Sequence, residues 1–334
     1  MPNRNSPILS TTDLSVRFSL RKNWLGKRQY LHAVQKVSLQ LFEGETLAIV
    51  GESGSGKTSL ARALIGLNSI WQGELKYAGQ AIDPQQNLAF SELRRNVQMV
   101  FQDPFGSLDP RLSVQEIIAE PLQIHGTHNK ALQKSRVADL LTQVGLPVEA
   151  ANRYPHQFSG GQRQRIAIAR ALAPEPKVII ADEPLSALDV SIQSQVMNLM
   201  KSLQTTHGLS YILVSHDMAA VHHLADRVAV MYLGRVIESA PVDQLFESPA
   251  HPYTLALLQS VPKIGRGKRR VGGSLKGDQP SPINPPSGCT FHPRCPMAQE
   301  RCKVEVPKDS HLSSEHQIAC HFPIGVTSAL EMTV

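Results

Sequence analysis

The stretch GESGSGKT, at Gly51 to Thr58, has the spacing G-x-x-x-x-G-K-[ST] of a loop that binds phosphate groups. Glycines let the backbone turn tightly, so that successive N–H groups point at phosphate oxygens. Lys57 offers a positive charge to the β- and γ-phosphates, and Thr58 offers a hydroxyl to Mg²⁺. The stretch lies between an apolar segment and a segment with helical spacing. This context favours a nucleoside triphosphate site over an incidental glycine-rich turn.

A second stretch, VIIADE at Val178 to Glu183, supplies the acidic groups that such a site requires. Its apolar residues predict a buried strand that ends at Asp182. The carboxylate of Asp182 is predicted to hold Mg²⁺ directly or through water. Glu183 follows at once and is placed to orient or deprotonate an attacking water. Two solvated acids at a strand end are the alternative, which the nearby phosphate loop disfavours.

The pattern around these motifs predicts alternating strands and helices. Residues 37–51 read as two strands joined by a Glu-Gly turn. A helix should follow the phosphate loop, with Leu60, Leu64 and Leu67 on one face. Strands that alternate with helices predict an α/β fold whose parallel sheet is covered on both faces. The other predicted elements are strands at 8–20, 177–182 and 210–216 and mostly helical structure at 112–145.

The composition is that of a soluble globular protein. The chain has 334 residues, of which 41% are hydrophobic and 19% are charged. It has no run of eighteen apolar residues that could span a bilayer, and its N-terminus lacks the apolar run of a secretory signal. We therefore expect a cytoplasmic protein. The net charge of +6 suits either an anionic partner or a solvated basic surface.

The cysteines are confined to the end of the chain. Cytoplasmic thiols stay reduced, so clustered cysteines indicate a metal site rather than disulfides. The spacing contains no C-x-x-C pair, but four thiolates suffice for a [4Fe–4S] cluster or tetrahedral zinc. His292 and His311 are interpreted as solvated or structural residues rather than ligands. The four cysteines are Cys289, Cys295, Cys302 and Cys320.

A third motif lies between the phosphate loop and the acidic strand. FSGGQRQRIAIARAL, at Phe158 to Leu172, contains SGGQ before a basic helical segment and resembles the signature motif of ATP-binding-cassette (ABC) ATPases. Three further motifs follow that family's order. Gln102 in VFQDP resembles the Q-loop glutamine, SALD at Ser186 to Asp189 resembles the D-loop, and His216 in VSHD resembles the switch histidine. The resemblance covers residues 8–260.

The resemblance implies a role for each matching residue. Glu183, His216 and Gln102 are the expected catalytic residues, and Gln102 would also relay to a transport partner. Phe18 stands where the family stacks an aromatic ring on adenine, although tyrosine is commoner there and a core phenylalanine is the alternative. The expected Mg²⁺ ligands are Thr58, Gln102 and Asp182. The residues expected to bind ATP are Phe18, Gly51, Ser53, Gly54, Ser55, Gly56, Lys57, Thr58, Ser59, Ser159, Gly160, Gly161, Gln162 and Asp189.

The family also implies a fold and an assembly. The fold is a P-loop nucleotide-binding domain with a RecA-like core, an antiparallel β subdomain and a helical subdomain. Two such domains pair head to tail and bury two ATP molecules. Ser159, Gly160 and Gly161 of one chain would donate hydrogen bonds to the γ-phosphate in the partner's phosphate loop. Hydrolysis would then let the two domains separate.

Three stretches resemble one branch of this family, the ATPase subunits of bacterial dipeptide and oligopeptide importers. They are FQDPFGSLDPRLSV, SPAHPYTLALLQSVP and PSPINPPSGCTFHPRCPMA. RIAIARAL, PLSALDVS and MYLG resemble the second, or F-type, ATPase of such systems. The resemblance implies a D-type ATPase partner, two membrane permease subunits and an extracytoplasmic binding protein, with no nucleic acid. The chain would lie peripherally on the cytoplasmic face of the inner membrane. Nickel, glutathione, microcin and antimicrobial-peptide systems share this branch, so the solute stays open.

Some relatives in the branch carry a [4Fe–4S] cluster. The resemblance therefore favours this cluster at the four cysteines, with zinc as the alternative and unliganded thiols as the third possibility.

We expect two parts in the chain, an ABC ATPase domain at 1–260 and an extension with the four-cysteine site at 261–334. The basic, glycine-containing run Lys263 to Gly277 is interpreted as a linker between them. The predicted function is ATP hydrolysis that powers import of dipeptides, oligopeptides or a related solute. The alternative is a cassette ATPase that acts on nucleic acid or ribosomes, which the single cassette and the lack of a coiled-coil insertion disfavour. A nucleotide-binding regulator without turnover is disfavoured by the presence of Glu183 and His216.

Overall fold

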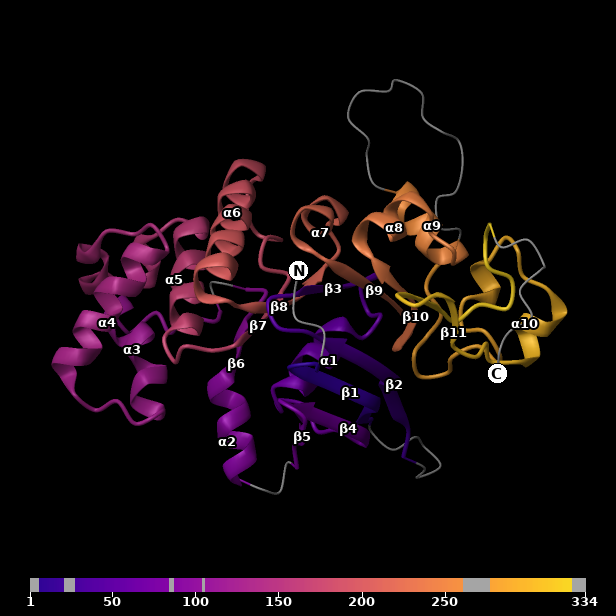
Figure 1. Cartoon of the computed structure of the whole chain (residues 1–334), viewed down its shortest axis with the longest axis horizontal. Helices are drawn as coiled ribbons and strands as arrows, with labels where there is room; N and C mark the ends of the chain where they lie inside the picture. Colours follow the sequence, from indigo (N-terminus) through magenta and orange to yellow (C-terminus); the bar gives the residue numbers. More distant parts are fainter. Residues whose placement is uncertain (1–5, 21–27, 84–86, 104–105, 261–276, 326–334) are drawn as a thin grey trace.

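The computed structural model describes residues 6–20, 28–83, 87–103, 106–260 and 277–325, and these form two sheets with helices around them (Figure 1). The smaller sheet is antiparallel, as expected for a β subdomain. Its strand order is β2 (Tyr30–Leu41), β1 (Leu9–Ser19), β4 (Gln72–Tyr77) and β5 (Gln80–Ala81).

The larger sheet is mixed. Strands β6, β7, β8, β3 and β9 are parallel, which confirms the predicted parallel sheet, while β10, β12 and β11 extend it in antiparallel fashion. The strand order is β11 (Ser310–Ser313), β12 (His316–Ile318), β10 (Arg235–Pro241), β9 (Arg227–Tyr232), β3 (Thr46–Val50), β8 (Ser210–Ser215), β7 (Val178–Asp182) and β6 (Val97–Val100).

The helices of the described residues cover both faces of this sheet and form a separate helical part at one end (Figure 1). The α-helices are α1 (Lys57–Leu64), α2 (Asn87–Asn96), α3 (Val114–Ile124), α4 (Lys130–Gln143), α5 (Gly160–Leu172), α6 (Val190–His207), α7 (Met218–Leu224), α8 (Val242–Glu247), α9 (Pro252–Gln259) and α10 (Glu300–Val304). Short 3₁₀ helices lie at Val148–Asn152, Pro155–Gln157 and His292–Arg294.

The central strands are buried on both faces, as a parallel sheet covered by helices requires. Side chains alternate between two hydrophobic clusters. Ile179 of β7 and Leu213 of β8 join the cluster that includes α5 and α6, whereas Ile180 and Ile212 join the cluster that includes α1. The helix predicted after the phosphate loop and the strand predicted from VIIADE are thus confirmed, and they lie against each other.

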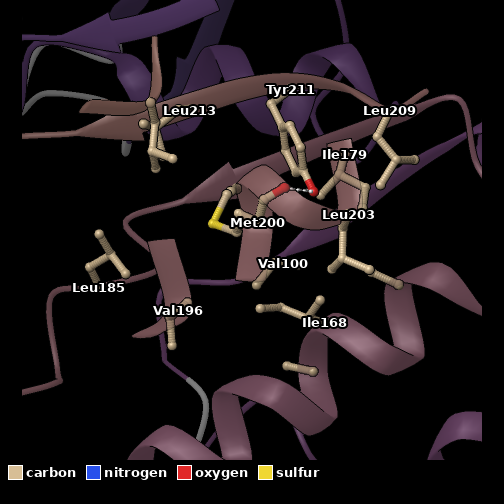
Figure 2. Packing of buried hydrophobic residues seen from close by; sticks show 14 of the residues in the cluster. Val100, Ile168, Ile179, Leu185, Val196, Met200, Leu203, Leu209, Tyr211 and Leu213 are labelled. Carbon is tan, nitrogen blue, oxygen red and sulfur yellow. Dashed lines mark hydrogen bonds between the residues drawn. The ribbon is translucent and has the colours of Figure 1, made fainter. Parts of the chain in front are cut away.

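Figure 2 shows the first of these clusters, where β7 and β8 meet α5 and α6. The Tyr211 hydroxyl donates a hydrogen bond of 3.3 Å to the carbonyl oxygen of Met200 in α6. Burial raises the pKa of the Tyr211 hydroxyl well above its usual range. The hydroxyl therefore stays neutral. Its hydrogen bond joins α6 to the sheet and leaves no buried oxygen of Tyr211 without a partner.

One element of the sequence interpretation is wrong. The sequence predicts that Leu67 lies on one helical face with Leu60 and Leu64, but α1 ends at Leu64 and Leu67 is 54% exposed. The reason is Gly66, whose φ of +70° is the left-handed conformation that commonly terminates a helix.

The C-terminal extension, defined here as residues 261–334, contributes to the larger sheet. Its β12 pairs with β10, and its Phe291 is buried in the same cluster as Tyr232 of β9. The predicted boundary at 260/261 and nearly all of the predicted linker Lys263 to Gly277 lie outside the described residues, so the division into two domains stays a prediction. In the part of the chain that the structure describes, each helix is too short or too polar to cross a bilayer.

Replacing Leu213 with Ala tests the packing of the central sheet. Leu213 is fully buried in β8, so the change should lower the free energy of unfolding by about 2–5 kcal/mol through the lost transfer energy and the cavity left behind. The measurement is urea denaturation of the full chain. Leu132→Ala in α4, where the side chain is 60% exposed, is the matched control and should change stability by less than about 0.5 kcal/mol. Equal effects at the two positions would contradict the assigned core.

Candidate nucleotide-binding site

The phosphate loop connects β3 to α1 and has a backbone that only glycine fits at two positions. Gly51 and Gly56 have φ values of +148° and +102°. A Cβ at Gly51 would lie 2.2 Å from the carbonyl oxygen of Met231, and one at Gly56 would lie 2.2 Å from that of Ala33. Glycine is therefore required at both positions for two reasons: it adopts the positive φ, and its lack of a Cβ lets the backbones of β2 and β9 approach closely.

Lys57 begins α1 and turns back over the loop. Its Nζ donates hydrogen bonds of 2.8 Å each to the carbonyl oxygens of Gly51 and Glu52. Burial lowers the pKa of Lys57, and the carboxylates of Glu183, Asp182 and Glu52 oppose this shift. The ammonium thus lies within the loop, close to the acids expected to organise the metal and the water.

Thr58 and Asp182 meet across the end of the sheet. The Thr58 hydroxyl donates a hydrogen bond of 3.1 Å to Oδ1 of Asp182, whose side chain is almost fully buried. Burial raises the pKa of Asp182, and the hydrogen bond from Thr58 opposes this effect. A hydroxyl and a carboxylate oxygen fit the hard-ligand preference of Mg²⁺.

Within the described ranges no group of three or more His, Cys, Asp or Glu side chains could hold a metal ion. Mg²⁺ tolerates this, since it commonly binds one or two carboxylates together with substrate phosphates and water.

Glu183 contacts the other two residues predicted to be catalytic, Gln102 and His216. Gln102 Nε2 donates a hydrogen bond of 2.8 Å to Oε2 of Glu183, and His216 Nδ1 lies 3.3 Å from Oε1. Glu183 has a φ of +46°, and its backbone N–H donates to the carbonyl oxygen of Val214. The ends of β6, β7 and β8 thus bring together the three residues predicted to be catalytic.

A cavity of about 310 Å³ is lined by six of the predicted ATP-binding residues and by two of the predicted catalytic residues. It also contains His32 of β2 and Pro282 of the extension, which the sequence interpretation missed. His32 lies in no motif, and the stretch PSPINPPSGCTFHPRCPMA gives Pro282 no role at the site, so only their folded positions reveal them. Phe18 is absent from the described lining, but it pairs across the sheet with Leu31, which does line the cavity. The predicted residues in the lining are Ser53, Gly54, Gly56, Lys57, Thr58, Ser59, Gln102 and Glu183.

The signature motif lies elsewhere in the same chain. Ser159 caps α5 by accepting a hydrogen bond from the N–H of Gln162, whose side chain accepts one from the Ser159 N–H in return. Gly161 packs closely against Ile192, since a Cβ added at Gly161 would lie 2.4 Å from Cγ2 of Ile192. Asp189 is the N-cap residue of α6 and is exposed. Among the described residues, the cavity at the phosphate loop is lined by none of Ser159, Gly160, Gly161, Gln162 and Asp189.

The four cysteines converge although 31 positions separate the first from the last in the numbering of the chain. All four line one small cavity of about 10 Å³ in the extension, roughly the space of one water molecule. Burial, with a smaller contribution from the other three thiols, raises the pKa of Cys320 to about 12. His292 also lines this cavity, and its Nδ1 lies 2.9 Å from the carbonyl oxygen of Cys289. His311 is exposed on β11. The thiol donors fit a soft metal centre by type, but among the described residues no three of them are arranged to hold a metal ion.

Comparison with known proteins gives two family matches. Residues 34–186 match the ABC transporter family, and residues 237–302 match the C-terminal region of oligopeptide/dipeptide transporters.

Two curated relatives match nearly the whole chain. The chain is 48% identical over 326 residues to the oligopeptide transport ATP-binding protein OppF of Haemophilus influenzae, covering 95% of this chain and 98% of the relative. It is 46% identical over 314 residues to the di/tripeptide transport ATP-binding protein DppF of Pseudomonas aeruginosa, covering 94% and 97%.

Solved structures resemble the cassette part. A dimeric ATP-binding cassette in a post-hydrolysis state with ADP and phosphate is 28% identical, with a TM-score of 0.62, and the match covers 70% of this chain and 98% of that one. A cassette of Clostridium perfringens that is part of an ABC transporter complex is also 28% identical with a TM-score of 0.62, covering 73% and 92%.

Replacing Gly56 with Ala tests the geometry of the phosphate loop. The new Cβ would collide with the carbonyl oxygen of Ala33, so the loop must distort, and we expect ATP binding to weaken by about tenfold or more. The measurement is titration with a fluorescent ATP analogue. Gly79→Ala is the matched control, because Gly79 also has a positive φ but has open space around it. Unchanged affinity in the Gly56 variant, with the fold intact, would contradict the assignment.

Proposed function

The chain belongs to the family of ABC transporter ATP-binding subunits, in the branch of oligopeptide and dipeptide permeases, and we propose that it hydrolyses ATP to power peptide import across the bacterial inner membrane. It is an ABC-type ATPase with the ABC cassette fold. The observation that carries the proposal is the combination of a complete phosphate-loop site with a match to the peptide-transporter C-terminal region. That second match disfavours the alternative of a cassette ATPase acting on nucleic acid or ribosomes.

The proposed assembly follows from the same relationship. Membrane permease subunits would form the pore, and a solute-binding protein would deliver the peptide from the other side of the membrane. The chain itself would lie peripherally on the cytoplasmic face. We propose a D-type ATPase as its immediate partner, since motifs of this chain resemble the F-type ATPase and its relatives include OppF and DppF.

The contacts at the phosphate loop support a distinct role in ATP hydrolysis for each of these residues. Lys57 and the loop N–H groups would bind the β- and γ-phosphates, while Thr58 and Asp182 would hold Mg²⁺, which neutralises phosphate charge when bound. Glu183 would orient and deprotonate the attacking water. Gln102 and His216 contact opposite oxygens of the Glu183 carboxylate, so either can fix its orientation.

The separation of the signature motif from the phosphate loop supports a dimeric active site. Gly160 and Gly161 begin α5 after the N-cap Ser159, so their backbone N–H groups have no carbonyl partner one turn earlier in the helix and suit an anion. Within the described part of one chain they lie outside the phosphate cavity. We propose that they complete the site of a partner cassette, as the dimeric relative in its ADP and phosphate state suggests.

We also propose that Cys289, Cys295, Cys302 and Cys320 bind a [4Fe–4S] cluster, with zinc as the alternative. Support comes from their convergence on one cavity from distant positions in the sequence. Binding would require the thiols to rearrange around the metal centre and to lose their protons. Such a centre would stabilise an extension whose described residues contain little regular structure.

The function is tested with the purified complex in proteoliposomes that contain ATP. The wild-type complex should accumulate labelled di- or oligopeptides. Glu183→Gln should bind ATP with unchanged affinity but hydrolyse it at least about 100-fold more slowly, because the amide cannot accept a proton, and uptake should stop.

Glu247→Gln is the matched control, since Glu247 is an exposed residue of α8, and it should behave as wild type. Normal hydrolysis by the Glu183 variant would show that its assigned role is wrong. Wild-type hydrolysis without uptake of any peptide tested would overturn the transport assignment while leaving the ATPase intact.

The metal proposal is tested on protein purified without oxygen. We expect broad absorption at about 400 nm together with bound iron and sulfide, from a cubane held by thiolates. Cys302→Ser should abolish the absorption, whereas His311→Ala should leave it unchanged. Stoichiometric zinc would favour the alternative, and absence of any metal would contradict both.

A further inference from the structure

Arg294 of the extension contacts the phosphate loop directly. Its Nη1 and Nη2 donate hydrogen bonds of 2.6 and 3.0 Å to the two carboxylate oxygens of Glu52, 242 positions earlier in the chain. Glu52 is the second residue of the phosphate-loop motif. The pairing is bidentate and charge-assisted, which is the stronger and more directional kind of ion pair.

The pair is better shielded from water than a surface salt bridge. The Arg294 side chain is only 5% exposed, and that of Glu52 is 27% exposed. Tyr232 Oη lies 3.4 Å from Nη1 of Arg294. Next to Arg294, Phe291 is buried against the rings of Tyr232 and Tyr253, at centroid distances of 5.3 and 5.4 Å. Arg294 therefore reaches Glu52 from a fixed position.

Glu52 is in turn linked to the phosphate-binding lysine. Its carbonyl oxygen accepts one of the Lys57 hydrogen bonds, and its N–H donates a bond of 2.9 Å to the Tyr253 hydroxyl. The side chain, the carbonyl and the N–H of one loop residue are thus all engaged. Movement of Glu52 would displace both the loop and the Lys57 ammonium.

The charge of Glu52 gives a second reason for the pairing. Among the residues of GESGSGKT it is the one acid, and a carboxylate in this loop repels an anionic nucleotide. Arg294 neutralises it. The extension approaches the loop at a second point, where Gln279 Oε1 lies 3.9 Å from the position of a Cβ on Gly54 and Pro282 lines the nucleotide cavity.

We propose that Arg294 is a positioning residue for ATP binding, which orders the phosphate loop through Glu52 and cancels the charge of that acid. The C-terminal extension is then part of the nucleotide site of its own chain. This inference concerns ATP binding and is independent of which solute is transported and of any metal at the cysteines.

The test compares three variants of the full chain in the purified complex. Arg294→Ala should raise the KM for ATP, and the Kd of a fluorescent ATP analogue, by about tenfold, with kcat changed less than about twofold. Arg294→Lys keeps the charge but not the bidentate geometry, so about a threefold increase is expected. Arg301→Ala is the control, because it breaks an exposed ion pair with Glu305 in the same extension and should change neither constant.

A purely structural role would instead reduce the fraction of active protein, and hence kcat, at unchanged KM and Kd. Unchanged KM in a folded Arg294→Ala variant would overturn the proposal. Should that variant fail to fold, an unchanged KM in Arg294→Lys would overturn it equally. Combining Arg294→Ala with Glu52→Gln should recover part of the lost affinity, since the uncompensated charge is gone; a double variant weaker than Arg294→Ala would contradict the pairing.

Discussion

The site depends on the alignment of three parallel strands. In the ladder Val50 of β3 lies opposite Ser215 of β8, and Asp182 of β7 lies opposite Val214 of β8. Each strand therefore ends at the same edge of the sheet, which is where open α/β sheets bind their ligands. The phosphate loop, the two acids and His216 leave the sheet within one or two residues of this edge. A shift of one residue in either pairing would turn the side chains to the other face and separate the Thr58 hydroxyl from Asp182.

Burial on both faces makes this alignment rigid, and it also sets the electrostatics of the site. The helices that cover the sheet exclude water from the strand ends, so burial lowers the pKa of Lys57 and raises that of Asp182. Both shifts disfavour the charged forms. Phosphate and Mg²⁺ would reverse this, because each supplies the opposite charge that the buried group lacks. The charged forms of Lys57 and Asp182 are thus unfavourable without a ligand and would be stabilised by a nucleotide bound with its metal ion.

The local motifs were predictable because their chemistry depends on short spacing. The phosphate loop, its strand and helix, and the acidic strand each occupy a few consecutive residues, and the structure forms these elements as expected. Leu67 was misassigned because periodicity continued through Gly66, whose left-handed conformation ended the helix. His32 and Pro282 could not be predicted, since their contribution arises from long-range packing. The same applies to Arg294, whose partner is 242 positions away. The antiparallel strands β11 and β12 were also missed, since they are only four and three residues long.

The extension has two buried polar attachments to the cassette, and their placement relates them to the four thiols. At the sheet edge, His316 Nε2 lies 2.8 Å from Oε1 of Glu238, a carboxylate that also accepts two backbone N–H groups. Burial raises the pKa of Glu238, but its hydrogen bonds outweigh burial and lower the pKa overall, so the group stays ionised and paired. At the phosphate loop the attachment is Arg294 to Glu52.

Arg294 directly precedes Cys295, and β12, which carries His316, ends two residues before Cys320. Both attachments therefore lie on segments whose thiols meet in one cavity. The same short segments of the extension thus carry both the thiols and the two polar contacts with the cassette.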